Sequence, residues 1–115
     1  VSERYMGYLL REIDLVAPLL GDRRRVTQLH WGGGTPTYQS VEEMRALHGK
    51  LLSHFQLEPD AEVALEVDPR VTTRAQMEAL RDMGFNRLSM GVQDFTPEVQ
   101  AAVNRNQSQE QTRVL

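Results

Sequence analysis

The stretch Leu29-His30-Trp31-Gly32-Gly33-Gly34-Thr35-Pro36-Thr37 decides the fold of this chain. It places three consecutive glycines after a short apolar run and ahead of a helix-like segment. Glycine loses more freedom on folding than other residues, so a glycine run suits main chain that turns with positive φ or approaches a ligand closely. Pro36 fixes its own φ and biases Thr35 toward extended geometry. The sequence therefore predicts a strand that ends in a bare backbone loop.

The composition is that of an ordinary globular protein. At 115 residues the chain holds one domain at most. Its 40% hydrophobic and 25% charged residues are typical proportions, and the net charge of −3 argues against a dedicated nucleic-acid binder. The basic run Arg23-Arg24-Arg25 suits either a solvated loop or a patch for an anion or a partner. Without cysteine, the chain offers no disulfide and no thiolate metal ligand.

Targeting signals are not found in the sequence. No apolar stretch approaches the roughly 20 residues of a membrane span, and no signal-peptide pattern is present. We therefore expect no membrane partner and a cytoplasmic location. Val1 leads almost directly into helix-like sequence, and a polar stretch over 106–111 lies close to the other end. We expect a fragment of a larger chain.

Hydrophobic periodicity predicts alternating helices and strands. Helices are expected over about 5–20, from a cap at Ser40 to about 54, from a cap at Thr72 or Thr73 to about 83, and after Thr96, with strands over 26–31, 61–67 and 87–92. Strands separated by single helices pair in parallel through right-handed crossovers. The order α-β-α-β-α-β-α thus predicts an α/β fold of parallel βαβ units. A segment of a (β/α) barrel and an open doubly wound sheet both fit.

Local signals place the ends of these elements. Ser40 with Glu43 predicts a capping box, Gly84 suits the residue after a helix end, and Pro97 suits the first position of the last helix. Pro59-Asp60 predicts a turn before the second strand. The residues of the second helix expected to face inward are Met44, Leu47, Leu51, Leu52 and Phe55.

Each predicted strand ends in polar or glycine-rich sequence. The three ends are Gly32-Gly33-Gly34-Thr35, Glu66-Val67-Asp68-Pro69 and Gly91-Val92-Gln93-Asp94. In both architectures ligands gather at the carboxyl ends of parallel strands. The sequence therefore predicts that these ends form one side of a single mouth.

Each candidate residue at this mouth has a structural and a functional interpretation. Gly33 and Gly34 form a tight turn or offer N–H and C=O groups to a ligand. An ionised Glu66 carboxylate buried without a partner would be costly. Glu66 is therefore either on the exposed face of an alternating strand or directed into the mouth, where it binds a cationic or hydroxyl-bearing ligand. Gln93 caps a loop, or its amide both donates to and accepts from ribose hydroxyls. Arg105 stabilises a helix C-terminus or forms a fork for a carboxylate.

Other polar residues suit structural roles. Asp68 precedes Pro69 and indicates a turn or loop anchor, and Asp94 suits the start of the last helix. His48 and His54 lie on one predicted helix at a spacing that does not put them on one face. We therefore predict no metal site within the chain.

Four segments resemble the oxygen-independent coproporphyrinogen III oxidases, which are radical S-adenosylmethionine enzymes of haem biosynthesis. These segments are His30-Trp31-Gly32-Gly33-Gly34-Thr35-Pro36-Thr37-Tyr38, Glu66-Val67-Asp68-Pro69-Arg70, Gly84-Phe85-Asn86-Arg87-Leu88-Ser89-Met90-Gly91-Val92-Gln93-Asp94-Phe95, and Val99-Gln100 through Val103-Asn104-Arg105. They span nearly the whole chain in the order and spacing of the family.

The resemblance implies that residues 1–115 form a partial radical-SAM domain, a segment of an incomplete (β/α) TIM-like barrel. In this family S-adenosylmethionine lies across the strand ends beside a 4Fe–4S cluster. The matched cofactor-binding positions are Gly33, Gly34 and Thr35 at the methionine part, together with Glu66, Gln93 and Arg105.

The resemblance also implies the reaction. In the full enzyme a 5′-deoxyadenosyl radical abstracts hydrogen from two propionates of coproporphyrinogen III, and oxidative decarboxylation to vinyl groups gives protoporphyrinogen IX. The resemblance does not identify the electron donor of the full enzyme. The family's cluster-binding cysteines precede a helix like the one over 5–20 and are not in this chain. We therefore expect no metal ligand, no catalytic residue and no activity in the isolated chain.

Two other functions stay open. A haem chaperone of the same fold typically carries Glu-Ala/Cys-Asn-Pro and Gly-Arg-x-His, whereas this chain has Glu66-Val67-Asp68-Pro69-Arg70 and Asn104-Arg105-Asn106-Gln107, which favours the oxidase. A non-catalytic module for a nucleoside-like ligand is the third possibility. In each case three parallel strands leave an apolar sheet face and two edges exposed, so we expect self-association.

Overall fold

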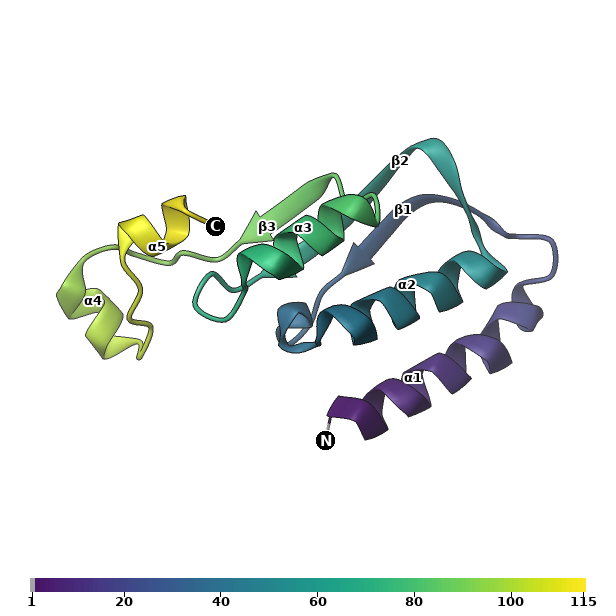
Figure 1. The fold of residues 1–115 in the computed structure, drawn as a ribbon, viewed down its shortest axis with the longest axis horizontal. Helices are drawn as coiled ribbons and strands as arrows, with labels where there is room; N and C mark the ends of the chain where they lie inside the picture. The colour runs from purple at the N-terminus through teal and green to yellow at the C-terminus, as the bar shows by residue number, and fades with distance from the viewer. Residues whose placement is uncertain (1) are drawn as a thin grey trace.

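The computed structural model describes residues 2–115 and shows helices and strands in the predicted order (Figure 1). The helices are α1 Ser2–Val16, α2 Val41–His54, α3 Arg74–Asp82, α4 Pro97–Ala102 and α5 Gln109–Arg113. The strands are β1 Arg25–Trp31, β2 Gln56–Val67 and β3 Arg87–Met90, and short 3-10 turns cover Ala17–Leu20 and Pro36–Tyr38. Helix α5 and the 3-10 turns have no counterpart among the predicted elements.

The strands form one parallel sheet in the order β1-β2-β3, which confirms the α/β fold of parallel βαβ units. Trp31 pairs with Leu65, and Val67 pairs with Met90, so the carboxyl ends of the strands lie at one edge. Figure 1 shows an open sheet, with α4 and α5 beyond that edge. Within residues 2–115, β1 and β3 each have one unpaired edge.

Helices α1, α2 and α3 lie on one side of the sheet (Figure 1). Successive residues of a strand point to opposite faces, and Val63, Leu65 and Val67 of β2 are buried on the helical side. They form one core with Met44 of α2 and Leu80 of α3. This core fixes β2, the central strand, beneath its helices.

The opposite face of the sheet is polar, which corrects the expectation of an apolar exposed face. Glu62 and Glu66 alternate with the core residues of β2, and His30 and Arg87 lie on either side of Ala64 in the neighbouring strands. Arg87 donates to Glu62 at 2.6 Å. No helix of the described residues covers this face (Figure 1), so its charged groups keep their contact with water.

Strand β2 begins at Gln56, so the predicted turn at Pro59-Asp60 is wrong. The pairing steps from Val26 with Leu57 to Gln28 with Glu62, which leaves the proline region in a register shift. Proline has no N–H for a ladder hydrogen bond, and strands accommodate it at such irregularities. Strand β2 therefore continues through Pro59-Asp60, where the sequence predicts a turn before the strand begins.

Three further boundaries and faces differ from expectation. Helix α1 ends at Val16, because Pro18 cannot continue the α-helical hydrogen bonding and a 3-10 turn follows. Strand β3 ends at Met90, since Gly91 begins the loop at the strand ends. Leu52 is 45% exposed rather than inward, because it lies beside, not on, the row of Met44, Leu47 and Leu51 that faces α1 and β1.

The predicted helix ends are largely confirmed. Ser40 and Glu43 form the capping box of α2, and Gly84 follows α3 with φ 90°. Thr73, not Thr72, caps α3. The Thr72 hydroxyl is buried and shares a hydrogen bond of 2.7 Å with Thr37. Pro97 opens α4, where Asp94 accepts from the Thr96 N–H at 2.6 Å, as expected of a residue serving the helix start.

No helix within residues 2–115 has the length and apolar character that crossing a membrane requires.

Candidate site at the carboxyl ends of the strands

Residues that follow all three strands line one cavity of about 350 Å³. The lining residues are Gly34, Thr35, Glu66, Val67, Asp68, Arg70, Ser89, Gly91 and Arg105. Among the predicted site residues, the cavity thus contains Gly34, Thr35, Glu66 and Arg105. The predicted mouth exists, and β1, β2 and β3 each contribute to it.

The glycine loop brings bare backbone to this cavity. Gly33 and Gly34 have φ of 77° and 57°, a region that other residues enter only with strain. The Gly33 N–H donates to Oε2 of Glu66 at 3.3 Å. A Cβ on Gly32 would lie 2.8 Å from Nε2 of His30, so a side chain here would require the His30 ring to move. The glycines therefore form a tight turn and also place main chain beside a carboxylate.

Glu66 lies on the polar face of the sheet at the end of β2. Its side chain is 51% exposed, and its Oε1 is 3.5 Å from Nε2 of His30. It lines the cavity beside Gly34 and Thr35. Both interpretations of Glu66 hold together: it is the exposed half of an alternating strand, and it faces the mouth.

Gln93 lies at the same edge but outside the first cavity. It lines an adjoining cavity of about 300 Å³ with Arg70, Asn104 and Arg105. Its φ is 69°, which is uncommon for a residue with a side chain. A Cβ on Gly91 would lie 3.1 Å from Nε2 of Gln93, so the amide packs against the bare Gly91 backbone. Gly91 and Arg105 connect Gln93 to the rest of the site.

Arg105 reaches the cavity because of the turn that ends α4. Asn104 has φ 51°, and the Arg105 N–H donates to the carbonyl of Gln100 at 2.8 Å, as in a Schellman motif. The guanidinium then donates to the carbonyl of Gly91 and lies 3.8 Å from Asp68. The turn thus brings the Arg105 guanidinium to the cavity, beside the Asp68 carboxylate.

Asp68 connects two arginines at this edge. Its carboxylate accepts from Nη2 of Arg70 at 2.6 Å and from Nε at 3.0 Å, and Arg105 is its second cationic neighbour. The hydrogen bonds from Arg70 hold the pKa of the Asp68 carboxyl below its ordinary value. The sequence predicts Asp68 only as a turn or loop anchor and does not indicate Arg70 as a site residue. The available signal was an arginine two residues after an aspartate at a strand end.

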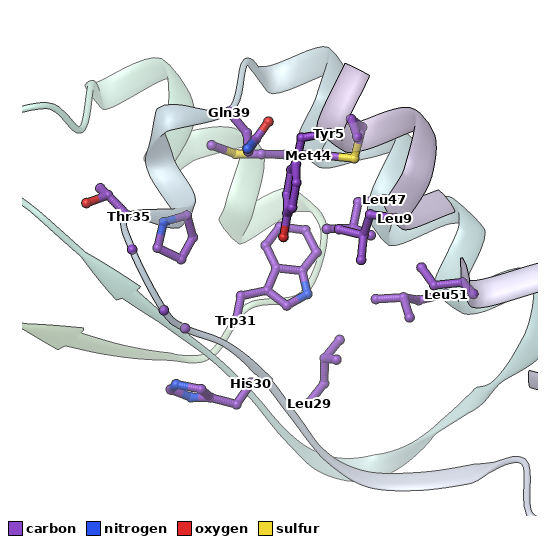
Figure 2. A pocket seen from close by; sticks show the side chains of 16 residues that line it. Tyr5, Leu9, Leu29, His30, Trp31, Thr35, Gln39, Met44, Leu47 and Leu51 are labelled. Atoms are coloured by element: carbon purple, nitrogen blue, oxygen red, sulfur yellow. The ribbon is translucent and has the colours of Figure 1, made fainter. Parts of the chain in front are cut away.

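A second, larger cavity of about 740 Å³ lies between α1, β1 and α2. Figure 2 shows Trp31 at its centre, with Leu9 of α1 and Leu47 of α2 nearby. Trp31 packs edge-on against Phe85, with 4.7 Å between the ring centroids. This apolar groove belongs to the helical side of the sheet, where Gly33 also lies at its rim.

The remaining histidines, His48 and His54, lie on α2 and contact neighbouring side chains. His48 is buried, and burial lowers the pKa of its imidazole. His54 shares a hydrogen bond of 2.7 Å with Asp14 of α1. No group of three histidine, aspartate or glutamate side chains within residues 2–115 is arranged to hold a metal ion.

Comparison with known proteins gives the family. A family model described as the Radical SAM superfamily matches residues 2–114. The oxygen-independent coproporphyrinogen III oxidase of Salmonella typhimurium is 50% identical over 109 residues, covering 95% of this chain and 24% of that protein. The corresponding oxidase of Pseudomonas aeruginosa is 46% identical over 116 residues, covering 99% and 25%. The chain therefore spans about a quarter of the curated relatives that it matches.

Solved structures agree. Coproporphyrinogen III oxidase from Escherichia coli, a radical SAM enzyme, matches with a TM-score of 0.93 and 48% identity over 99% of this chain and 26% of that chain. Elp3 from Methanocaldococcus infernus shares the fold alone, with a TM-score of 0.57 and 15% identity over 90% of this chain and 28% of that chain. These findings confirm the resemblance to the oxidases and the segment of a (β/α) barrel. This chain belongs to the radical SAM superfamily.

Proposed function

We propose that this chain is part of an oxygen-independent coproporphyrinogen III oxidase and that its strand ends bind S-adenosylmethionine. The observation that carries the proposal is the cavity into which Gly34 of the glycine loop, Glu66 at the end of β2 and Arg105 after α4 converge. The similarity to oxidases of known name supports the enzyme class. Residues 1–115 are then a partial domain of a larger protein.

The residues present fit an amino acid joined to a nucleoside. The cavity combines a carboxylate, Glu66, with guanidinium groups of Arg70 and Arg105, so it offers partners to both charges of an amino acid. Bare backbone at Gly34 and Gly91 lets a ligand approach main chain closely. A Cβ on Gly91 would press on the Gln93 amide, so the missing side chain is a feature of the site.

Each residue then has a role in binding. Glu66 accepts from the ammonium group, and Arg105 donates to the carboxylate as a planar fork. Gln93 pairs with the ribose hydroxyls, because its amide both donates and accepts. Gly33, Gly34 and Thr35 present backbone to the methionine part.

S-adenosylmethionine, when bound, supplies the radical chemistry of this superfamily, together with a 4Fe–4S cluster. The chain's own residues do not fit the cluster, since the sequence contains no cysteine. What these residues do is bind and orient the sulfonium compound against the strand ends. We infer that the complete protein converts two propionates of coproporphyrinogen III to vinyl groups, which gives protoporphyrinogen IX, and that the isolated chain is inactive.

Anaerobic turnover of the complete protein that carries this chain tests the proposal. Coproporphyrinogen III with S-adenosylmethionine and a low-potential reductant is expected to yield protoporphyrinogen IX. Hydrogen bonds to charged groups contribute about 1.5–3 kcal/mol, so Glu66→Ala is expected to weaken S-adenosylmethionine binding about 10- to 100-fold. Glu62→Ala is the matched control, because Glu62 lies on the same strand and face but outside the cavity.

The alternatives give different results in the same experiments. Stoichiometric haem binding without decarboxylation supports a haem chaperone, and nucleoside binding without either supports a non-catalytic module. Formation of 5′-deoxyadenosine by the isolated chain after iron–sulfur reconstitution would contradict its inactivity.

A further inference from the structure

We propose that Asp68 is a positioning residue that sets the direction of the Arg105 guanidinium in the cavity, and that Arg70 fixes Asp68 in turn. This inference rests on the proposed binding of S-adenosylmethionine, in which Arg105 receives the carboxylate. Three observations support it: the position of Asp68 between two cations, the attachment of Arg70 to the loop that carries Arg105, and the orientation of Arg105 itself.

Asp68 has the geometry of a shared counter-ion. Its side chain is only 13% exposed, and Arg70 donates to both of its oxygens. The backbone N–H of Arg70 also donates to Oδ1 at 3.0 Å. Arg70 therefore binds both oxygens of the carboxylate, and Oδ2 also lies 3.8 Å from Nη2 of Arg105. At that distance, between two mostly buried side chains, the attraction of opposite charges orients a guanidinium without a direct hydrogen bond.

Arg70 also connects the end of β2 to the loop that holds Arg105. Its Nη1 donates to the carbonyl of Asn104, the residue before Arg105, at 3.4 Å. Asn104 is in the left-handed region with φ 51°, so the chain direction at this point is fixed by the Schellman turn of α4. The Arg70 side chain thus contacts both Asp68 and the backbone next to Arg105.

The orientation of Arg105 depends on few contacts. Its side chain is 21% exposed, and Nη2 donates to the Gly91 carbonyl. Its Nε is buried and has no hydrogen-bond partner within the described residues. Without the negative charge of Asp68, the guanidinium groups of Arg70 and Arg105 would lose the carboxylate that they share, and their repulsion would turn Arg105 away. Asp68 also lines the cavity, but Arg70 already donates to both of its oxygens, so its effect on the ligand passes through Arg105.

The test compares two ligands that differ only in the carboxylate. Dissociation constants for S-adenosylmethionine and decarboxylated S-adenosylmethionine are measured by titration calorimetry on the complete protein, in the wild type and in D68N. Asparagine keeps an acceptor for the Arg70 N–H, so the loop keeps its turn. We expect D68N to weaken S-adenosylmethionine binding about 10-fold and the decarboxylated compound less than about 2-fold. R70Q is also expected to weaken binding of S-adenosylmethionine more than binding of the decarboxylated compound, but by a smaller factor than D68N.

Controls separate positioning from loss of structure. D60N is the matched control, because Asp60 is exposed on β2 far from the strand end, and it is expected to leave both constants unchanged. If D68N weakens both compounds equally, or neither, the inference is overturned. If the wild type binds S-adenosylmethionine no better than the decarboxylated compound, the carboxylate role of Arg105 is wrong. If the wild type binds neither, the proposed function itself fails.

Discussion

At the scale of single residues, glycine is required at the strand ends for two different physical reasons. Gly33 and Gly34 are needed for their positive φ, since a Cβ on either would meet nothing within 4 Å. At Gly91 the reason is space, because a Cβ there would lie 3.1 Å from the Gln93 amide and 3.6 Å from Arg105. The site thus uses bare backbone both to turn the chain and to seat two side chains.

Gly91→Ala tests the second reason. The added methyl group presses on the Gln93 amide and meets Arg105 only at ordinary contact distance. Overpacking costs about 1–3 kcal/mol, so S-adenosylmethionine affinity is expected to fall about 10-fold. Gly49→Ala in α2 is the control, because a Cβ there has free space. Titration calorimetry measures both variants. Equal affinity in Gly91→Ala and the wild type would show that the Gly91 backbone is not part of the site.

His48 gives a pH dependence of stability. Burial between Trp31 and Phe85 lowers the pKa of His48 from 6.5, so the unfolded chain binds its proton more readily than the folded one. The stability from neutral His48 is complete above pH 6.5 and is lost as the pH falls below that value. Urea titrations between pH 7.5 and 5.5 are expected to show a falling free energy of unfolding in the wild type and a smaller fall in His48→Leu. Parallel curves for the two proteins would contradict this assignment.

At the scale of elements, local sequence signals determine helix ends with useful accuracy. Ser40 accepts from the Glu43 N–H at 3.1 Å, and Glu43 accepts from the Ser40 N–H at 2.8 Å. Both hydrogen bonds satisfy backbone or side-chain groups close in sequence, so the residue pattern alone predicts them. How each helix or strand packs against its neighbours depends instead on contacts between residues far apart in the sequence.

Ser40→Ala is expected to destabilise the protein by about 1 kcal/mol through loss of this cap. Ser53→Ala is the comparison, because the exposed Ser53 hydroxyl donates only to the Lys50 carbonyl of the same helix. Urea unfolding of both variants measures the difference. A cost for Ser53→Ala as large as that for Ser40→Ala would remove the capping box as the cause.

The elements also show where prediction from sequence ends. Periodicity and caps identify the helices and strands, because these depend on residues close in the chain. The early start of β2 escaped prediction, since Pro59 is tolerated by a register shift that only the neighbouring strand determines. The approach of Arg105 to Asp68 is not predicted either, because the turn at Asn104 directs Arg105 across the loops.

At the scale of the whole molecule, the open sheet has a polar face and two unpaired edges. The face opposite the helices contains the Arg87–Glu62 pair and the His30–Glu66 pair, which have little tendency to seek apolar cover. The edges of β1 and β3 are different, since their free N–H and C=O groups can pair with another strand within reach. Any self-association of the isolated chain therefore belongs to the edges rather than the face.

Sedimentation velocity of the isolated chain checks this. The wild type is expected to form larger species as the concentration rises, through pairing of exposed edges. Leu88→Lys is expected to reduce the association, because a charge on an edge strand opposes pairing. Leu88 is 44% exposed on β3, so the change costs little of the core. A monomer at all concentrations would contradict the prediction.

The most direct measurement is a structure of the complete protein with S-adenosylmethionine bound. We expect the ligand to lie across the carboxyl ends of β1, β2 and β3, in contact with Gly34, Glu66, Gln93 and Arg105. A ligand bound elsewhere, with these side chains unchanged and untouched, would contradict it.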